Sequence, residues 1–425
     1  MVKIYFDTSG CSINFSETEI MKGLISKHDF ELVKNPEDAF VIIINICTVK
    51  GNKNSLKKIR KLHENYPDKK YIIAGCITKN IIPEIKEIIK EPSLISTHNI
   101  KEIISVIEET INENPIEITE KNQDEKINLP KVRKNKIIGI IPISQGCLGY
   151  CAYCSVKLIK GDLRSYPIES IIKEIKTALN QGCKEIWITS QDTGAYGRDI
   201  NINLIGLIEE ITNIEADFIV RLGMMNPNHV LEMLDDLIEI YKNKKIFKFL
   251  HIPVQSGNNK ILRLMKRKYK VDDFKRIVEK FRKEIEDITI STDIITGFPS
   301  ETDEQFKDSL TLIDDIKPDV LNISRFNARP GTDAFKMEEQ IKGEVPKDRS
   351  RKLTSNFEWI AFRKNKKWDN WKGTILINEK GKNNTFVGRN SSYKPVVVKG
   401  NFKLGEKIQV KIVNTTKHYL VGEKI

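Results

Sequence analysis

The chain has few of the residues that hydrolytic and secreted proteins depend on. It holds six histidines in 425 residues, and no Ser-His-Asp or Cys-His grouping stands out, so acid–base hydrolysis is not expected as its main activity. No apolar run is long enough to cross a membrane. The opening segment, MVKIYFD, lacks the basic and apolar regions of a signal peptide. A cytoplasmic protein without disulfides is therefore expected.

Cysteine is scarce, but six of the seven cysteines fall into two groups of three. The compact group is the C-x3-C-x2-C run of Cys147, Cys151 and Cys154. The scattered group, in which each member follows an apolar run typical of a strand, is Cys11, Cys47 and Cys76. Thiolates are the usual ligands of iron–sulfur clusters, and three of them leave one iron of a [4Fe-4S] cube free. The pattern therefore predicts two open clusters.

Other interpretations of these cysteines stay open. Structural zinc sites are normally closed by four ligands, and neither group has a fourth Cys or His nearby, which makes zinc the weaker interpretation. Taken alone, the scattered group would be interpreted as three buried structural cysteines, because free Cys is among the most buried residue types. Cys183 belongs to neither group and is expected to pack behind the apolar run EIWITS.

Strands and helices alternate in the first part of the chain. Strand patterns at 3–7, 41–45 and 71–74 are separated by helical patterns such as 16–26 and 52–65. This alternation predicts a parallel sheet with helices on its faces. Ligands bind such sheets at the carboxyl ends of the strands. The scattered cysteines lie at or just beyond those ends, which makes a single site plausible.

A second alternating series predicts a partial (β/α)6 barrel. Its expected strands, each followed by a helical stretch, are 136–144, 185–190, 218–223, 247–254, 288–297 and 320–327. The compact cysteine run lies in the loop after the first of them, so it should open onto the C-terminal face, where such barrels have their active sites. The fold class is thus α/β. The expected divisions are a sheet domain at 1–113, a polar linker at 114–134, the barrel at 135–345, a linker helix at 346–369 and a last domain at 370–425.

The positive charge is concentrated near the end of the chain. The net charge is +12, and residues 361–425 hold fifteen Lys or Arg against four acids. Five short strand patterns there predict a small β-barrel of the oligonucleotide-binding kind, with a nucleic acid as partner. A merely solubilising surface is the alternative. Arg389 and Tyr393 are spaced for phosphate contact and base stacking on one hairpin, together with Phe386, for which core packing is an equal alternative.

Sequence blocks in all three expected domains resemble one family. They are INICTVK, IAGC, SQGCLGYCAYC, SQDTGAYG, RLGMMNP, HIPVQSG, LMKRKY, TDIITGFPSET and RFNARPGT. Along almost the whole chain they resemble the methylthiotransferases of the radical S-adenosylmethionine superfamily. The resemblance implies that a barrel cluster cleaves S-adenosylmethionine, that an auxiliary cluster in the N-terminal domain carries the sulfur, and that a C-terminal TRAM domain grips RNA.

The resemblance also implies roles for single residues. Cys147, Cys151 and Cys154 would hold the radical cluster, and Cys11, Cys47 and Cys76 the auxiliary one. Tyr153 would lie near the adenine of the cofactor. The superfamily usually binds the methionine amino group at the end of the second strand, where this chain has Ser190, Gln191 and Asp192. Gln255, Ser256 and Asp293 would line the cavity, although Asp293 would alternatively cap the next helix. Gly297 and Pro299 are expected to shape a turn.

Within the family, SQGCLGYCAYCSVK, SQDTGAYGRD and RLGMMNP most resemble the archaeal and eukaryotic threonylcarbamoyladenosine branch. This implies a tRNA enzyme that converts N6-threonylcarbamoyladenosine at position 37 to its 2-methylthio derivative by radical C–H activation. Two [4Fe-4S] clusters, S-adenosylmethionine, a ferredoxin- or flavodoxin-type electron donor and a sulfur source are implied, and a monomer is expected. Isopentenyladenosine tRNA, a ribosomal-protein aspartate and a non-catalytic metal-containing RNA-binding protein stay as alternatives, and the basic last domain favours RNA as substrate.

Overall fold

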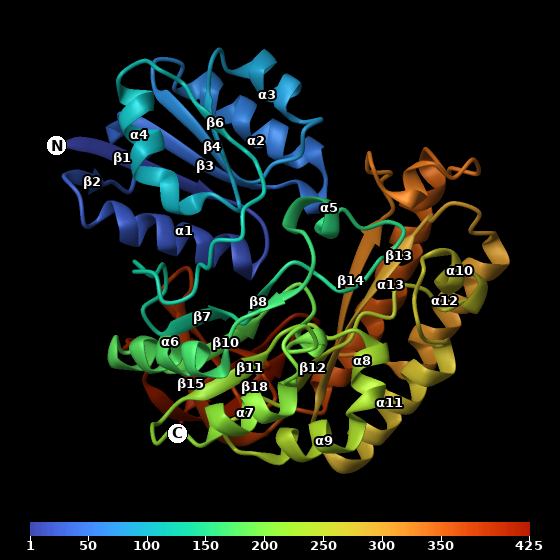
Figure 1. The fold of residues 1–425 in the computed structure, drawn as a ribbon. Coiled ribbons are helices and arrows are strands. Elements are labelled where there is room, and N and C mark those ends of the chain that lie inside the picture. The colour runs from blue at the N-terminus through green and yellow to red at the C-terminus, as the bar shows by residue number, and fades with distance from the viewer.

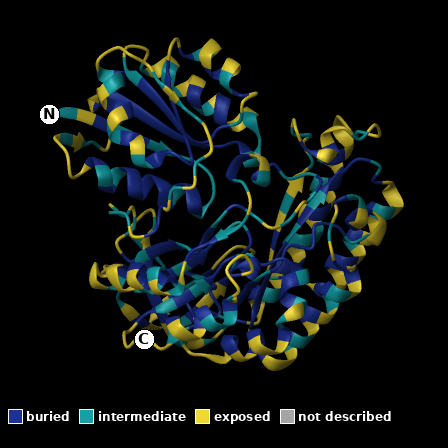
Figure 2. Ribbon diagram, in the orientation of Figure 1, coloured by how far each residue is buried: buried dark blue, intermediate teal, exposed yellow. Residues whose placement is uncertain are grey.

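The computed structural model describes residues 1–425, apart from the side chain of Lys50. An N-terminal α/β domain lies over one end of a central partial barrel, and a small β-barrel closes the opposite end (Figure 1). The strands form the buried interior of each part, while the outward faces of the helices are exposed (Figure 2). The predicted α/β class is confirmed. No helix among the described residues is both long and apolar enough to span a bilayer.

The N-terminal domain is a six-stranded parallel sheet of order β2-β1-β3-β4-β5-β6. Its strands are β1 Val2–Thr8, β2 Phe30–Leu32, β3 Val41–Cys47, β4 Lys70–Cys76, β5 Ser93–Ser96 and β6 Glu117–Ile118. Its helices are α1 Ser12–Ile25, α2 Asn52–Asn65, α3 Ile82–Ile88 and α4 Ile103–Ile111. Side chains of α1 and α4 pack on one face of the sheet, and those of α2 and α3 on the other. Every residue of β3 is buried, because both faces of a parallel sheet are covered. The predicted parallel sheet is confirmed.

The central domain contains the six predicted barrel strands in two parallel sheets, β11-β10-β7 and β12-β13-β14. These strands are β7 Ile138–Pro142, β10 Glu185–Thr189, β11 Ile219–Leu222, β12 Phe249–His251, β13 Thr289–Thr296 and β14 Val320–Arg325. A parallel bridge between Val220 and Ile246 joins the two sheets. In the described pairing, β7 and β14 do not pair with each other, so the barrel is open between them.

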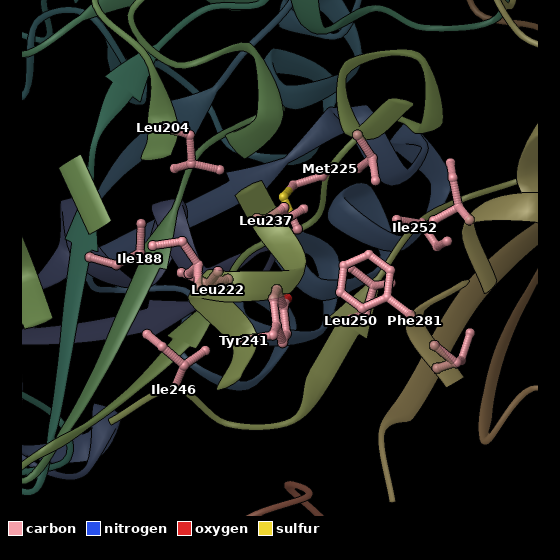
Figure 3. Close-up of a cluster of buried hydrophobic side chains, with 14 of the residues drawn as sticks. Ile188, Leu204, Leu222, Met225, Leu237, Tyr241, Ile246, Leu250, Ile252 and Phe281 are labelled. Carbon is pink, nitrogen blue, oxygen red and sulfur yellow. The ribbon is translucent and has the colours of Figure 1, made fainter. Parts of the chain in front are cut away.

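Helices cover the outside of the barrel strands. They are α6 Ile168–Asn180, α7 Leu204–Thr212, α8 Pro227–Glu232, α9 Leu234–Lys242, α10 Asn259–Leu264, α11 Val271–Glu284 and α12 Asp303–Ile316. Strand residues such as Ile188 and Leu250 meet Leu237 and Tyr241 of α9 and Phe281 of α11 in one core (Figure 3). Cys183 lies in the same core, as the sequence predicted.

The polar segment that connects the first two domains packs into the interface between them. The ammonium groups of Lys126 and Lys131 are buried and pair with Glu17 and Glu174. Gly23 of α1 makes room for this segment, since an added Cβ would lie 2.1 Å from the carbonyl oxygen of Pro130. Two lysines of this linker thus neutralise buried acids at the domain interface.

The helix α13, Glu344–Lys366, leads to the small closed barrel of order β15-β16-β17-β19-β18. Its strands are β15 Lys372–Lys380, β16 Thr385–Arg389, β17 Pro395–Lys399, β18 Lys407–Thr415 and β19 Leu420–Lys424. This barrel docks at the N-terminal ends of the central strands. Asn378 donates a hydrogen bond of 2.7 Å to the carboxylate of Glu185, and Lys394 forms a buried 2.9 Å ion pair with Asp319.

The docking contradicts one sequence-based prediction. Tyr393 is only 9% exposed, and its ring lies 4.8 and 5.0 Å from the rings of Phe247 and Phe249. Arg389 lies over the ring of Tyr393 and donates a hydrogen bond to its carbonyl oxygen. The prediction that this tyrosine offers a stacking face to RNA is wrong, because the central barrel covers it. Phe386 lies in the core of the small barrel, which confirms the alternative.

Candidate active site between the two cysteine groups

The compact cysteine group lies in the loop after β7, at the C-terminal end of the barrel strands. The short strand β8, Ser144–Gln145, pairs with β9, Arg164–Ser165, and holds the base of this loop. The helix α5, Val156–Lys160, follows the last cysteine. The backbone N–H of Gly149 donates to the Cys147 sulfur at 3.3 Å, and the Arg267 guanidinium donates to the Cys151 sulfur at 3.1 Å. Two of the three sulfurs thus already accept hydrogen bonds, as thiolate ligands do.

The half-buried thiols of this loop need a positive partner to ionise. Burial, followed by the nearby carboxylate of Asp192, raises the pKa of Cys147 to about 12. Burial also raises the pKa of Cys154. A metal centre removes this penalty, because a coordinating thiol is deprotonated by the charge of the ion. Three thiols without a fourth Cys or His in the loop fit an open cluster better than a closed structural site.

The scattered cysteines meet at the C-terminal edge of the N-terminal sheet. Cys47 and Cys76 are paired residues at the ends of β3 and β4, and Cys11 immediately precedes α1. The Cys11 thiol donates to Asn14 Oδ1 at 3.3 Å, and Asn14 Nδ2 lies 3.9 Å from the Cys76 sulfur. Gly10 permits this approach, since it has φ +130° and an added Cβ would lie 2.8 Å from Cys47 Cβ. Three strand ends therefore bring the cysteines to one place.

Neither cysteine group is a finished metal site in this structure. In the part of the chain that the structure describes, no three His, Cys, Asp or Glu side chains already stand in metal-binding geometry. Cys11 is half-buried, whereas Cys47 and Cys76 are buried.

The helix α5 ties the compact loop to the N-terminal domain (Figure 1). The Lys160 ammonium lies 3.1 Å from Glu17 Oε1 and donates to Thr97 Oγ1 at 2.9 Å. Lys126 pairs with the same carboxylate oxygen at 2.8 Å. Burial alone would raise the pKa of Glu17, but Lys126 and Lys160 lower it to about 2. The buried carboxylate is therefore ionised. Its single negative charge faces two ammonium groups, so the cluster of Glu17, Lys126 and Lys160 has one positive charge in excess.

The guanidinium of Arg329 lies within electrostatic reach of both cysteine groups. It follows β14 in the block RFNARPGT, and its Nη1 donates to the carbonyl oxygen of Tyr153 at 3.0 Å. Burial lowers its pKa, while Cys154 of one group and Cys47 of the other both act in the opposite direction. Arg329 is thus within electrostatic reach of both groups. The partly buried Tyr153 ring packs edge-on against Phe298, with 6.5 Å between the ring centres, beside the last cysteine of the loop.

Ser190, Gln191 and Asp192, the residues predicted to bind the methionine amino group, have different surroundings. Asp192 is buried and accepts hydrogen bonds from the backbone N–H of Asn226 at 3.1 Å and from its side-chain amide at 2.5 Å. Asn226 in turn accepts from Arg267, which contacts Cys151. Asp192 therefore orients the arginine beside the compact group. Gln191 instead lines a small cavity between the two domains, and Ser190 bonds to the hydroxyl of Thr193.

Gln255 and Asp293 lie together on the other half of the barrel. The backbone of Gln255 bridges to β13 in a left-handed conformation, with φ +72°. Asp293 Oδ1 accepts from His251 Nε2 at 3.0 Å and from Asn322 Nδ2 at 2.7 Å. The alternative of Asp293 as a helix cap is wrong, because it lies within β13 and Thr302 caps α12. Ser256 is fully buried.

Sequence reasoning missed five residues of this region: Lys160, His251, Arg267, Asn322 and Arg329. His251, Arg267 and Arg329 lie in the blocks HIPVQSG, LMKRKY and RFNARPGT, so the signal was present in the motifs. Lys160 and Asn322 carry no such signal, since each acquires its partner only when distant segments meet.

Comparison with known families divides the chain into three matched parts. Residues 141–313 match the radical SAM superfamily, residues 3–96 match the family described as UPF0004, and residues 373–425 match the TRAM domain. Among solved structures, a radical S-adenosylmethionine methyltransferase, TsrM, from Kitasatospora setae superposes with a TM-score of 0.57 over 79% of this chain and 77% of its own. At 12% identity this likeness shows the fold alone. The chain thus has the barrel of radical S-adenosylmethionine enzymes.

Two curated relatives narrow the assignment. A probable threonylcarbamoyladenosine tRNA methylthiotransferase from Pyrococcus horikoshii is 40% identical over 100% of both chains. The threonylcarbamoyladenosine tRNA methylthiotransferase of Homo sapiens is 36% identical over 100% of this chain and 74% of its own. The chain belongs to the threonylcarbamoyladenosine tRNA methylthiotransferase family, and the predicted family is confirmed.

Proposed function

We propose that this protein converts N6-threonylcarbamoyladenosine, at position 37 beside the anticodon of tRNA, to its 2-methylthio derivative. The observation that carries the proposal is the placement of the two cysteine groups. They lie on facing domains, are joined through α5 and Glu17, and have Arg329 within reach of both. A reaction that makes a carbon radical at one centre and supplies sulfur from another needs this arrangement.

The compact group, Cys147, Cys151 and Cys154, would hold the cluster that binds S-adenosylmethionine. Bound there, a [4Fe-4S] cluster with an open iron supplies the electron that cleaves the sulfonium. Arg267 donates to the Cys151 sulfur, and Asp192 keeps that arginine in place through Asn226. These residues would hold the thiolate and keep water away from the radical. Tyr153 lies beside this group, where the adenine would bind.

The scattered group, Cys11, Cys47 and Cys76, would hold the auxiliary cluster that carries the sulfur. Asn14 and Gly10 position the three thiols on the sheet edge. The buried positive charge of Lys160 lies within electrostatic reach of Cys76 and Cys11, which favours an anionic set of thiolates. Ser190, Gln191, Gln255 and Asp293 would line the cavity for cofactor and substrate.

The remaining assignments extend this proposal. A ferredoxin- or flavodoxin-type protein would supply electrons, and a separate source would renew the sulfur. We infer a monomer that acts in the cytoplasm, where thiols stay reduced. The matched parts at 3–96, 141–313 and 373–425 support a division into a sheet domain, a barrel at 135–345 and an RNA-binding domain at 370–425. The expected sheet domain at 1–113 has to be extended to include β6, because this strand lies in the expected linker at 114–134 and pairs with β5. The expected linker helix at 346–369 corresponds to α13.

The test is mass spectrometry of tRNA nucleosides from a strain that lacks the gene. Loss of the 2-methylthio threonylcarbamoyl nucleoside, with its unmethylthiolated precursor accumulating, is the expected result. Restoration by the wild-type gene and not by a Cys151→Ala gene is the control. An unchanged nucleoside profile would overturn the proposal. If the strain instead lost the 2-methylthio derivative of isopentenyladenosine, the enzyme would belong to the branch of the family that modifies isopentenyladenosine.

A further inference from the structure

Two large aromatic side chains on α13 face solvent. Trp359 is 59% exposed and Phe362 is 41% exposed, whereas Leu353 and Ile360 on the opposite side of the helix are buried in the central core. Lys352, Arg363 and Lys366 share the exposed side, because positions 352, 359, 362, 363 and 366 follow the repeat of one helical face. We call these five residues the α13 stripe.

The aromatic and basic side chains of the stripe are already associated. The guanidinium of Arg363 lies 4.5 Å from the centre of the Trp359 ring, and the ammonium of Lys366 lies 5.9 Å from that of Phe362. Such cation–π pairs hold the rings in a defined orientation at the surface. The stripe therefore presents two oriented rings together with their positive charges.

The acidic residues next to the stripe leave its centre positive. Asp348 pairs with Lys352 at 2.9 Å and Asp369 pairs with Lys366 at 2.9 Å, one at each end. Glu358 pairs with Lys417 of the small barrel. Arg363, beside Trp359, makes no ion pair among the described residues. The Arg363 guanidinium can therefore pair with an anionic partner without breaking an existing ion pair.

The positive charge of the stripe indicates which kind of partner would bind to it. Single exposed apolar residues are ordinary on protein surfaces, but a pair of rings interleaved with Lys and Arg is the pattern of a single-stranded nucleic-acid site, where bases stack and cations hold phosphates. A second copy of the chain would bring the same positive charges together, which disfavours self-association through this face. RNA is the occupant that satisfies both the rings and the charges.

The position of α13 agrees with an RNA that enters the active site. The helix begins at the C-terminal end of β13, where the Thr296 hydroxyl donates to the carbonyl oxygen of Pro346. It then runs along β14, the edge strand on the open side of the barrel (Figure 1). Trp359 is thirteen residues beyond Pro346, or about 20 Å along the helix at about 1.5 Å per residue. The helix that carries the stripe therefore runs from the active-site end of the barrel to the small barrel.

We propose that the α13 stripe is an RNA-contact surface, on which an unpaired base of the substrate tRNA stacks against Trp359 and Phe362 while Arg363 and Lys366 contact its phosphates. The inference rests on the proposed tRNA substrate and deepens it. It also supplies the stacking surface that the buried Tyr393 does not offer. In this arrangement the TRAM domain and α13 hold the RNA outside the barrel while the target base enters it.

The first experiment compares the wild-type protein with the double variant Trp359→Ala/Phe362→Ala. The probe is a fluorescein-labelled anticodon stem-loop RNA, and binding is followed by fluorescence anisotropy at several salt concentrations. Loss of stacking on one base should weaken binding about tenfold to a hundredfold. The single variant Trp359→Tyr should keep most of the wild-type affinity for the RNA, because a tyrosine ring can still stack on a base. Phe40→Ala is the matched control, since Phe40 is 46% exposed on the N-terminal domain, and it should bind normally.

The second experiment separates charge from stacking. Arg363→Gln should reduce the salt dependence of binding by about 0.7 in the log–log slope, the value for one phosphate contact on a single strand. In turnover assays the double variant should raise KM with kcat unchanged at saturating RNA, since the stripe touches no reacting atom. All variants should keep the wild-type melting temperature, because the altered side chains are exposed.

The outcomes distinguish this inference from the function on which it rests. Wild-type protein that fails to bind the RNA would overturn both. Wild-type binding that the double variant retains in full would overturn the α13 stripe alone. Light scattering that shows a wild-type dimer and a monomeric double variant would also overturn it, because the stripe would then be a contact between two copies.

Discussion

The two cysteine groups each offer three thiol ligands but are built in different ways. The compact group lies on one loop segment of eight residues that runs from Cys147 through Cys154, and the spacing of its cysteines alone identifies it. The scattered group needs the ends of β3 and β4 and the start of α1 to meet at one sheet edge. A site on one loop needs only local geometry, whereas a site on three strand ends exists only if the whole sheet folds.

The two groups also differ in what holds them together. Hydrogen bonds from Arg267 and Gly149 organise the compact loop from within the central domain. Asn14 organises the scattered group from within the N-terminal domain. The contact between the domains that carry the groups includes the ion pairs of Lys160 and Lys126 with Glu17. The thiols of each group and the ion pairs that align the two domains therefore belong to different residues. Single substitutions can remove one without the other.

The largest effect is expected from Cys151→Ala. Loss of this thiol leaves two ligands for the barrel cluster and also leaves the Arg267 guanidinium without its sulfur partner. S-adenosylmethionine cleavage by the anaerobically reconstituted protein, measured as 5′-deoxyadenosine, should fall to background. The matched control is Cys183→Ala, which removes a core cysteine outside both groups and should keep cleavage. Continued cleavage by Cys151→Ala would contradict the assignment.

Cys47→Ala should separate the two groups functionally. This variant keeps Cys147, Cys151 and Cys154, the three ligands proposed for the barrel cluster, so S-adenosylmethionine cleavage with a chemical reductant should persist. Methylthiolated tRNA should not form, and bound iron should fall by about half if each group holds one cluster. Mass spectrometry of the tRNA and iron analysis measure the two effects. Methylthiolated product from this variant would show that the scattered group is not the sulfur carrier.

Glu17→Gln should weaken the alignment of the groups without removing any ligand. Two buried ammonium groups would lose their shared carboxylate, and unpaired buried charges cost about 3–5 kcal/mol. Urea denaturation at neutral pH should show this loss of unfolding free energy. Glu174→Gln, at the nearby Lys131 pair, is a matched control. It should destabilise the interface too, but leave Lys160 and α5 in place.

The same carboxylate predicts a pH dependence. The pKa of Glu17 is about 2 in the folded protein, against 4.5 for an ordinary glutamate, so ionisation stabilises the folded state above about pH 4.5. This contribution is lost as the pH falls from 4.5 toward 2. The difference in stability between wild type and Glu17→Gln should therefore narrow over that range. A constant difference would mean that Glu17 does not act through its charge.

The smallest effect is expected far from both groups. Tyr393→Phe removes a buried hydroxyl at the opposite end of the barrel and keeps the ring between Phe247 and Phe249. The cost should be about 1 kcal/mol of unfolding free energy. RNA affinity and S-adenosylmethionine cleavage should not change. A large loss of RNA binding would mean that the small barrel releases this tyrosine when it meets RNA.

Much of the fold could be predicted because its signals are local. The strand patterns that end at Cys47 and Cys76, and the six barrel strands, are apolar runs bounded by turn residues. Their alternation with helices predicts parallel sheets for chiral and steric reasons. The position of the small barrel could not be predicted in this way. The alternation of side chains in the hairpin at Arg389 predicts which of them share a face. It does not predict which domain covers that face, and the central barrel covers Tyr393.

By itself, the sequence determined the ligand chemistry and the order of the domains, because thiol spacing and strand periodicity depend only on neighbours along the chain. The tertiary structure alone decided that Glu17 pairs with Lys160, that Arg329 comes within electrostatic reach of both cysteine groups, that Tyr393 is buried, and that Trp359 remains exposed. The physical reason is that burial and charge pairing are properties of the packed chain. A residue acquires them only from segments that are distant in sequence.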